Sequence, residues 1–295
     1  MTARVAANHI WSRLFGRGLV STPDDFGTRG EKPSHPELLD WLATEFQRLG
    51  WSRKAFIKEI VMSSAYRQSS QPRPELADRD PNNILLARQN RMRLEAEAVR
   101  DSFLAVSGLL NPTLGGPGIR PPLPADIAAL GYANSVKWKE SEGADRYRRG
   151  LYIHFQRTVP YPMLMTFDAP DSNATCTRRE RSNTPLQALV LLNDPAFFEC
   201  AQVLGRQVAS EAVASEGQRI KRAFELSLSR PPTDEEFGRL MKLHEDYLRL
   251  ARQNPQNAAR IAGANEWASA HAEESAALIG VARTILNLDE FVTRE

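Results

Sequence analysis

The chain has 295 residues, of which 42% are hydrophobic and 25% charged, and its formal net charge is +2. That length allows one large domain or two modest ones with a real core. The near-neutral charge argues against a generic nucleic-acid binder, which carries a strongly basic surface, so we expect no nucleic-acid partner. Since no run approaches the roughly 20 apolar residues of a membrane span, we also expect no transmembrane segment. The first residues show no signal peptide.

Helical patterns dominate the first 110 residues. Ser34 and Glu37 have the spacing of a capping box, which predicts that a helix begins there, and Gly50 fits the position just after its end. Apolar residues at helical spacing and strong helix formers predict three more helices, at Thr2–Phe15, from Ser52 to Val61, and at Arg93–Val106.

The composition changes between residues 111 and 145. The run NPTLGGPGIRPPLP is rich in Gly and Pro and lacks the P-loop pattern, so we interpret it as an irregular connection. We therefore divide the chain into a helical half at 1–110, a connection at 111–145, and an Arg-rich segment with a second helical half at 146–295, all within one composite domain.

The second half contains one strand-like region and several helix starts. Residues 150–167 are rich in β-branched and aromatic residues but are interrupted by prolines, which predicts a small extended or hairpin element. Thr184 begins a helix in which we expect Leu186, Leu189, Val190 and Leu192 to be buried. Pro195 either kinks that helix or starts a new one. Further helices are expected at 235–251 and about 266–288. The predicted fold is mainly α, with two packed helical halves.

A cluster of arginines is the main candidate for a binding site. Residues 146–181 contain seven arginines and three acids, a net charge of +4. The planar guanidinium suits bidentate contact with carboxylate, phosphate or sulfate, and three of the arginines precede the helix start at Thr184. The alternative is that these arginines tie loops together through nearby carboxylates. The candidate anion-binding residues are Arg149, Arg157, Arg178, Arg179 and Arg181.

Three residues near the arginines are accessory candidates. Cys176 would act as a nucleophile only beside a base, and His154 is the one histidine of this region. We expect Cys176 instead to be a small buried structural residue, and its distance from Cys200 favours two free thiols. Tyr161 and neighbouring aromatic residues suit either a sugar-binding surface or the core. A carboxylate or His154 bonded to Cys176 would favour catalysis, whereas a cleft of arginines and aromatic rings would favour binding.

No cofactor is expected in this chain. The five histidines are scattered and form no metal-binding spacing, so we predict no metal site. No CxxCH motif for covalent haem attachment occurs.

Several long runs resemble one family. They are FGRGLVSTPDDFGTRGEKPSHPELLDWLA, RQNRMRLEAEAVRDSFLAVSG, YRRGLYIHFQRTVPYPMLMTFDAPD, RRERSNTPLQALVLLNDP and LNLDEFVTRE, in this order along the chain. They are similar to a domain of unknown function that is abundant in planctomycetes, number 1553 in that series. The family pattern has two adjacent histidines where this chain has Arg13 and Leu14, so no role of those histidines carries over. The arginine run and Cys176 do match.

The resemblance implies a setting for the chain. Relatives are larger exported proteins that carry c-type haem in separate cytochrome c-type domains, which implies a periplasmic or cell-envelope location. Relatives also have a helical segment upstream, so we expect this chain to be a truncated version whose N-terminal helix is partly uncovered. We expect a binding or docking module for an anionic polysaccharide or an upstream cytochrome c-type domain. The alternative is an enzyme that acts on an anionic carbohydrate.

Overall fold

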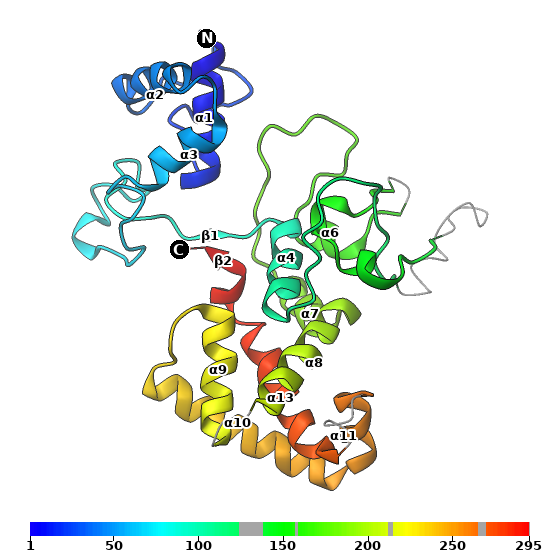
Figure 1. Cartoon of the computed structure of the whole chain (residues 1–295). Coiled ribbons are helices and arrows are strands. Elements are labelled where there is room, and N and C mark those ends of the chain that lie inside the picture. The colour runs from blue at the N-terminus through cyan, green and yellow to red at the C-terminus, as the bar shows by residue number, and fades with distance from the viewer. Residues whose placement is uncertain (124–137, 157–158, 212–214, 265–269, 295) are drawn as a thin grey trace. The chain divides into compact units, whose positions relative to one another are not determined.

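The computed structural model describes residues 1–123, 138–156, 159–211, 215–264 and 270–294 (Figure 1). Over these ranges the chain is mainly helical, and its regular β-structure is one antiparallel pair of two-residue strands. The prediction of a mainly α fold is confirmed. None of the described helices combines the length and the apolar character needed to cross a bilayer.

The chain forms two compact units. Unit 1 comprises residues 1–93, 176–178 and 293–295, and unit 2 comprises residues 94–175 and 179–292. Each unit has its own cluster of buried hydrophobic residues.

Unit 1 is built from three helices, a 3-10 turn and the strand pair. Its elements are α1 (Thr2–Phe15), α2 (Pro36–Arg48), α3 (Arg53–Val61), η1 (Pro74–Leu76), β1 (Met92–Arg93) and β2 (Thr293–Arg294). The core is aromatic, with the rings of Trp11 and Phe15 stacked at 4.2 Å and those of Phe46 and Phe56 at 4.9 Å. The helix pattern in the first 61 residues therefore places these rings on facing sides of α1, α2 and α3.

The start of α2 corrects one prediction. His35, not Ser34, is the residue that precedes the helix, and no side chain caps it. Pro36 occupies the first turn, and the hydroxyl of Ser34 donates instead to the carbonyl of Leu19 at 3.3 Å. The end of α2 is as predicted, because Gly50 adopts φ +62°, a left-handed conformation that suits glycine.

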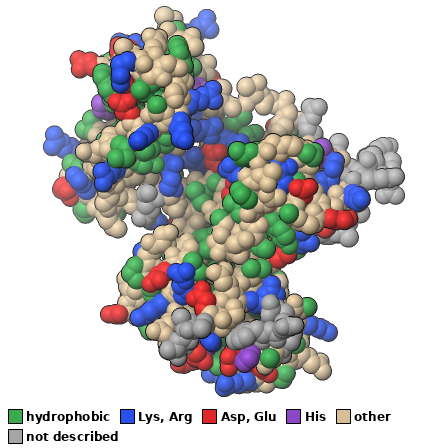
Figure 2. All heavy atoms as spheres, in the orientation of Figure 1, with side chains coloured by type: hydrophobic (Ala, Val, Ile, Leu, Met, Phe, Trp, Pro, Cys, Tyr) green, Lys and Arg blue, Asp and Glu red, His purple; other side chains and the backbone are tan. Residues whose placement is uncertain are grey.

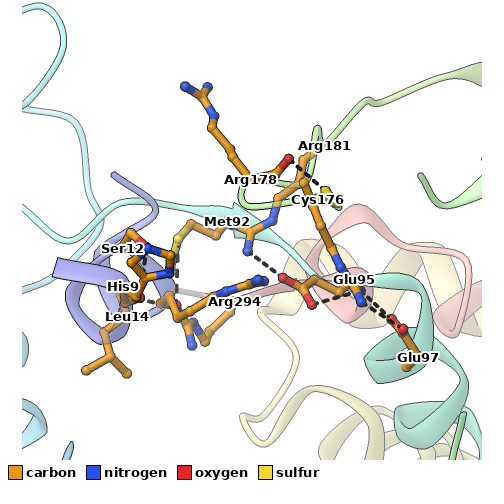
Figure 3. Close-up of polar contacts among 12 residues, drawn as sticks. His9, Ser12, Leu14, Met92, Glu95, Glu97, Cys176, Arg178, Arg181 and Arg294 are labelled. Carbon is orange, nitrogen blue, oxygen red and sulfur yellow. Dashed lines mark hydrogen bonds and ion pairs between the residues drawn. The ribbon is translucent and has the colours of Figure 1, made fainter. Parts of the chain in front are cut away.

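The C-terminal strand completes unit 1. β2 pairs antiparallel with β1, so that Met92 lies opposite Arg294. The guanidinium of Arg294 donates to the carbonyls of Arg13 and Leu14 at 3.0 and 2.8 Å (Figure 3). These carbonyls belong to the last turn of α1, where carbonyl groups have no hydrogen-bond partners within the helix. A residue 280 positions away thus caps the C-terminal end of α1.

Unit 2 contains the remaining elements. They are α4 (Ala96–Val106), η3 (Gly143–Tyr147), η4 (Gly150–Tyr152), α6 (Pro162–Thr166), α7 (Pro185–Asn193), α8 (Pro195–Ser210), α9 (Glu216–Leu228), α10 (Asp234–Gln253), α11 (Pro255–Ala262), α13 (Ala272–Ile285) and η5 (Asp289–Val292). α13 packs against α8, α9, α10 and α11 and is largely buried. A Cβ added at Gly205 would lie 2.7 Å from Ile279 Cα, so glycine permits α8 to approach α13 this closely.

Local capping explains where these helices begin. Thr233 and Glu236 form a complete capping box at the start of α10. The Asp194 side chain accepts from the N–H groups of Ala196 and Phe197, so a new helix starts at Pro195. Thr184 caps α7 as expected, by accepting from the N–H of Gln187.

The segment 150–167 is less extended than its composition indicates. It begins with η4, forms an isolated parallel bridge between Ile153 and Ile119, and ends in the short helix α6. Pro162 lies at the first turn of α6, where its missing N–H has no cost, and this explains the change from extended to helical backbone. The last helix, α13, is shorter than the predicted range 266–288, of which residues 266–269 lie outside the described part.

Candidate functional site

The predicted arginines do not all belong to one unit. Arg149, Arg179 and Arg181 lie in unit 2, whereas Arg178 and Cys176 belong to unit 1. Arg157 lies outside the described residues. Among the described residues, the predicted arginines that share a unit are therefore Arg149, Arg179 and Arg181.

The partners of these arginines are carboxylates at the start of α4. Glu95 immediately precedes the helix, and Glu97 and Asp101 follow within its first two turns. Glu97 and Asp101 are four residues apart, so they lie on the same face. Negative side chains near a helix N-terminus are also favoured by the helix dipole.

Arg179 and Arg181 contact two of these acids. Arg179 Nη1 lies 2.7 Å from Glu97 Oε2, and Arg179 Nη2 lies 3.1 Å from Glu97 Oε1, which makes a bidentate pair. Arg179 Nη1 also contacts Glu95 Oε2 at 3.0 Å. Arg181 Nη2 reaches the other oxygen of Glu95 at 3.3 Å.

Arg149 contacts the third acid. Its Nε donates to Asp101 Oδ2 at 2.7 Å, and Asp101 Oδ1 accepts from the N–H of Gly150 at 2.6 Å. A Cβ added at Gly150 would lie 2.7 Å from the Glu97 carbonyl oxygen, so the chain approaches α4 here only because the residue is glycine. We call the six residues Glu95, Glu97, Asp101, Arg149, Arg179 and Arg181 the α4 charge cluster.

The α4 charge cluster is formally neutral, but its arginines are unequally engaged. The Arg179 side chain bonds both Glu95 and Glu97. Arg149 and Arg181 each make one ion pair through a single nitrogen, and their side chains are 42% and 27% exposed. Because a guanidinium has five N–H donors, these two side chains retain donors toward solvent.

Two further arginines, Arg100 within α4 and Arg148, are buried and bond to backbone carbonyls. Arg148 donates to the carbonyls of Thr113, Gly115 and Pro117. Residues 113–117 of the Gly/Pro-rich connection are therefore held by its guanidinium. Arg100, a residue that the sequence patterns did not single out, donates to the carbonyls of Arg146 and Arg148 at 2.8 and 3.4 Å. Burial lowers the pKa of Arg100.

The accessory candidates lie in different surroundings. Tyr161 is a core residue whose hydroxyl donates to the carbonyl of Pro122 at 3.3 Å, and burial raises its pKa. His154 lies beside Trp138, with ring centroids 6.5 Å apart.

Cys176 is exposed, which corrects the prediction that it is buried. Its thiol donates to the carbonyl of Arg178 at 3.1 Å. Both cysteines are free, as expected. Cys200 is the buried thiol, and its burial raises the pKa to about 12. Over the described ranges, no three His, Cys, Asp or Glu side chains converge in a way that could hold a metal ion.

Comparison with known proteins gives one match. A family model described as PSD1, a protein of unknown function (DUF1553), matches residues 1–244. Neither the curated proteins nor the solved structures contain a match to the chain.

Proposed function

The chain belongs to the PSD1 (DUF1553) family of proteins of unknown function, and we propose that it is a binding or docking module that takes an anionic group of a partner at the α4 charge cluster. The observation that carries this proposal is the partial engagement of Arg149 and Arg181. Each uses one nitrogen to hold an internal carboxylate and keeps a partly exposed side chain. A sulfate or carboxylate of a partner can therefore be bound without breaking the internal pairs.

Because of the internal carboxylates, we expect an anion to bind at this site weakly and in a salt-dependent way. Glu95, Glu97 and Asp101 hold the guanidinium groups in place, which lowers the cost of ordering them. The same acids reduce the net attraction for an incoming anion, and screening acts over about 8 Å at physiological ionic strength. A ligand with several anionic groups fits this balance better than a single ion, because several weak contacts add up.

The enzyme alternative has less support. A cysteine nucleophile needs a neighbouring base, and the described contact of the Cys176 thiol is with a backbone carbonyl. Tyr161 is buried, and burial opposes loss of its phenolic proton. An enzyme acting on an anionic carbohydrate would therefore draw its acid and base from residues other than Cys176 and Tyr161.

The partner is an anionic polysaccharide or an acidic surface of another domain. The family resemblance supports a setting in the periplasm or cell envelope, where a cytochrome c-type domain in the same larger protein would supply the haem that this chain does not attach. We propose both this location and this partner.

Titration with a sulfated polymer tests the proposal. We expect dextran sulfate to bind the purified chain at low salt and to bind at least tenfold more weakly at about 0.5 M salt, because exposed charge contacts are screened. Absence of binding at low salt would contradict the proposed function. Binding that does not change with salt would show that the contacts are not those of the exposed arginines.

A further inference from the structure

Helix α7 exposes an apolar surface. Its sequence, PLQALVLLN, is apolar around most of its circumference, which is typical of a buried helix. Nevertheless, Leu186 and Leu189 are 66% and 53% exposed, whereas Leu191 is buried. The prediction that Leu186, Leu189, Val190 and Leu192 are buried is therefore wrong for the first two. Residues three apart lie on one face of a helix, so the two leucines are neighbours.

The packing of α7 explains this exposure. Its other side packs against α6 and α8, and the Gln187 side chain on that side donates to the carbonyl of Thr166. Met165, on α6, is a further exposed hydrophobic residue. In Figure 2 hydrophobic side chains gather on this part of unit 2. We call Leu186 and Leu189 the α7 patch.

Arginines lie at both ends of α7. Arg181 precedes the helix and shares the carboxylate of Glu95 with Arg179. At the other end, Arg283 donates to the carbonyl of Leu192 at 2.8 Å and to Asn193 Oδ1 at 3.2 Å. The hydrogen-bond partners of Arg283 among the described residues are thus neutral oxygens, which do not compensate its positive charge. The nine residues of α7 separate the two ends by about 13 Å.

We propose that the α7 patch and its flanking arginines dock a short amphipathic helix of a partner protein, with apolar side chains on one face and Asp or Glu at both ends. This inference rests on the proposed function and selects a protein over a polysaccharide. Buried apolar anchors surrounded by arginine are typical of protein interfaces. A sulfated polysaccharide would pair with the arginines but has no apolar side chains to cover Leu186 and Leu189.

Defined probes test this inference on the full chain. The first probe is a synthetic helical peptide of about 14 residues with leucines along one face and glutamates near both ends, about 13 Å apart. The second is the same peptide with glutamine in place of glutamate. The third is dextran sulfate, a polyanion without apolar side chains. Binding is measured by fluorescence anisotropy at low salt.

The decisive variant is Leu186→Gln with Leu189→Gln. We expect it to bind the acidic peptide at least tenfold more weakly and to bind dextran sulfate as the wild type does. Leu250→Gln is the matched control, because Leu250 is also a 53% exposed leucine of unit 2 but lies on α10. All these leucines are exposed, so the thermal midpoint is expected to stay within a few degrees.

The outcomes separate the two proposals. Loss of peptide binding in the double leucine variant but not in L250Q, and weaker binding of the glutamine peptide, support the docking site. If dextran sulfate binds but the acidic peptide binds the wild type and the double leucine variant equally, the docking site is overturned and the anion-binding function is supported. Failure of all three probes to bind overturns both.

Discussion

Arg179 holds Glu97 through two parallel hydrogen bonds, although the two residues lie 82 positions apart in the chain. This pair fixes the segment before α7 to the first turn of α4. It also places the neighbouring Arg181 on Glu95, so that the ion pairs organise the candidate binding surface before any ligand arrives.

The Arg179–Glu97 pair is expected to stabilise unit 2. The side chains are 24% and 28% exposed and the geometry is bidentate, so a double-mutant cycle with Arg179→Gln and Glu97→Gln should give a coupling of about 1 kcal/mol. The measurement is urea unfolding of the wild type, both single variants and the double variant. A coupling near zero would show that the pair adds nothing to the free energy of unfolding, as is found for many exposed pairs.

Replacing Arg294 should destabilise unit 1. Arg294→Ala removes the donors to the carbonyls of Arg13 and Leu14, so the last turn of α1 loses its cap and the free energy of unfolding falls by about 1 kcal/mol. Hydrogen exchange of the amide of Gly16, which donates to the Ser12 carbonyl, is expected to accelerate. Arg249→Ala on α10 serves as the control, and equal protection of Gly16 in both variants would contradict the capping role.

Stability is expected to fall as the pH drops through about 6, because of His244. His244 lies on α10 and is buried, and its Nδ1 has no described hydrogen bond but lies 3.7 Å from Glu216 Oε2. Burial lowers its pKa, opposed by Glu216, Glu245 and Glu274. Below the ordinary value of about 6.5, the unfolded chain binds a proton that the folded chain resists, which favours unfolding. His244→Gln should flatten the change in urea midpoint between about pH 7.5 and 5.5. A wild-type midpoint that rises over this range as the pH falls would contradict the account.

The two thiols are expected to differ in reactivity. Cys176 is exposed and should react with a maleimide or disulfide reagent at an ordinary rate, whereas Cys200 is buried with a pKa of about 12 and should react only when unit 2 opens. The measurement compares labelling of Cys176→Ser and Cys200→Ser in the native state and in urea. Equal native rates would show that Cys200 is not protected by the fold.

Local signals in the sequence are sufficient for much of the fold. Thr184, Thr233 and Ser52 cap helices through side chains that the sequence reveals directly, and Pro195 starts a helix because proline is tolerated only in the first turn. The failures involve contacts between distant residues. The prediction that Ser34 caps α2 is wrong because its hydroxyl bonds to Leu19, fifteen residues earlier, rather than to the helix that follows.

The candidate site was only partly predictable for the same reason. The arginine run was visible, but its partners Glu95, Glu97 and Asp101 are supplied by α4, which nothing in the run itself indicates. The net charge of the segment alone therefore exceeds the charge that is left once these carboxylates are counted. The exposure of Leu186 and Leu189 was likewise hidden, because an apolar helix gives no pattern that tells which face packs.

The binding of dextran sulfate by two double variants at low salt is the most direct test of whether the α4 charge cluster binds an anionic partner. Arg149→Gln with Arg181→Gln removes the two partly engaged arginines, whereas Arg239→Gln with Arg249→Gln removes two exposed, acid-paired arginines of α10 and the same net charge. We predict that the first variant binds dextran sulfate at least tenfold more weakly than the wild type and that the second binds as the wild type does. Equal binding by the two variants would contradict the account.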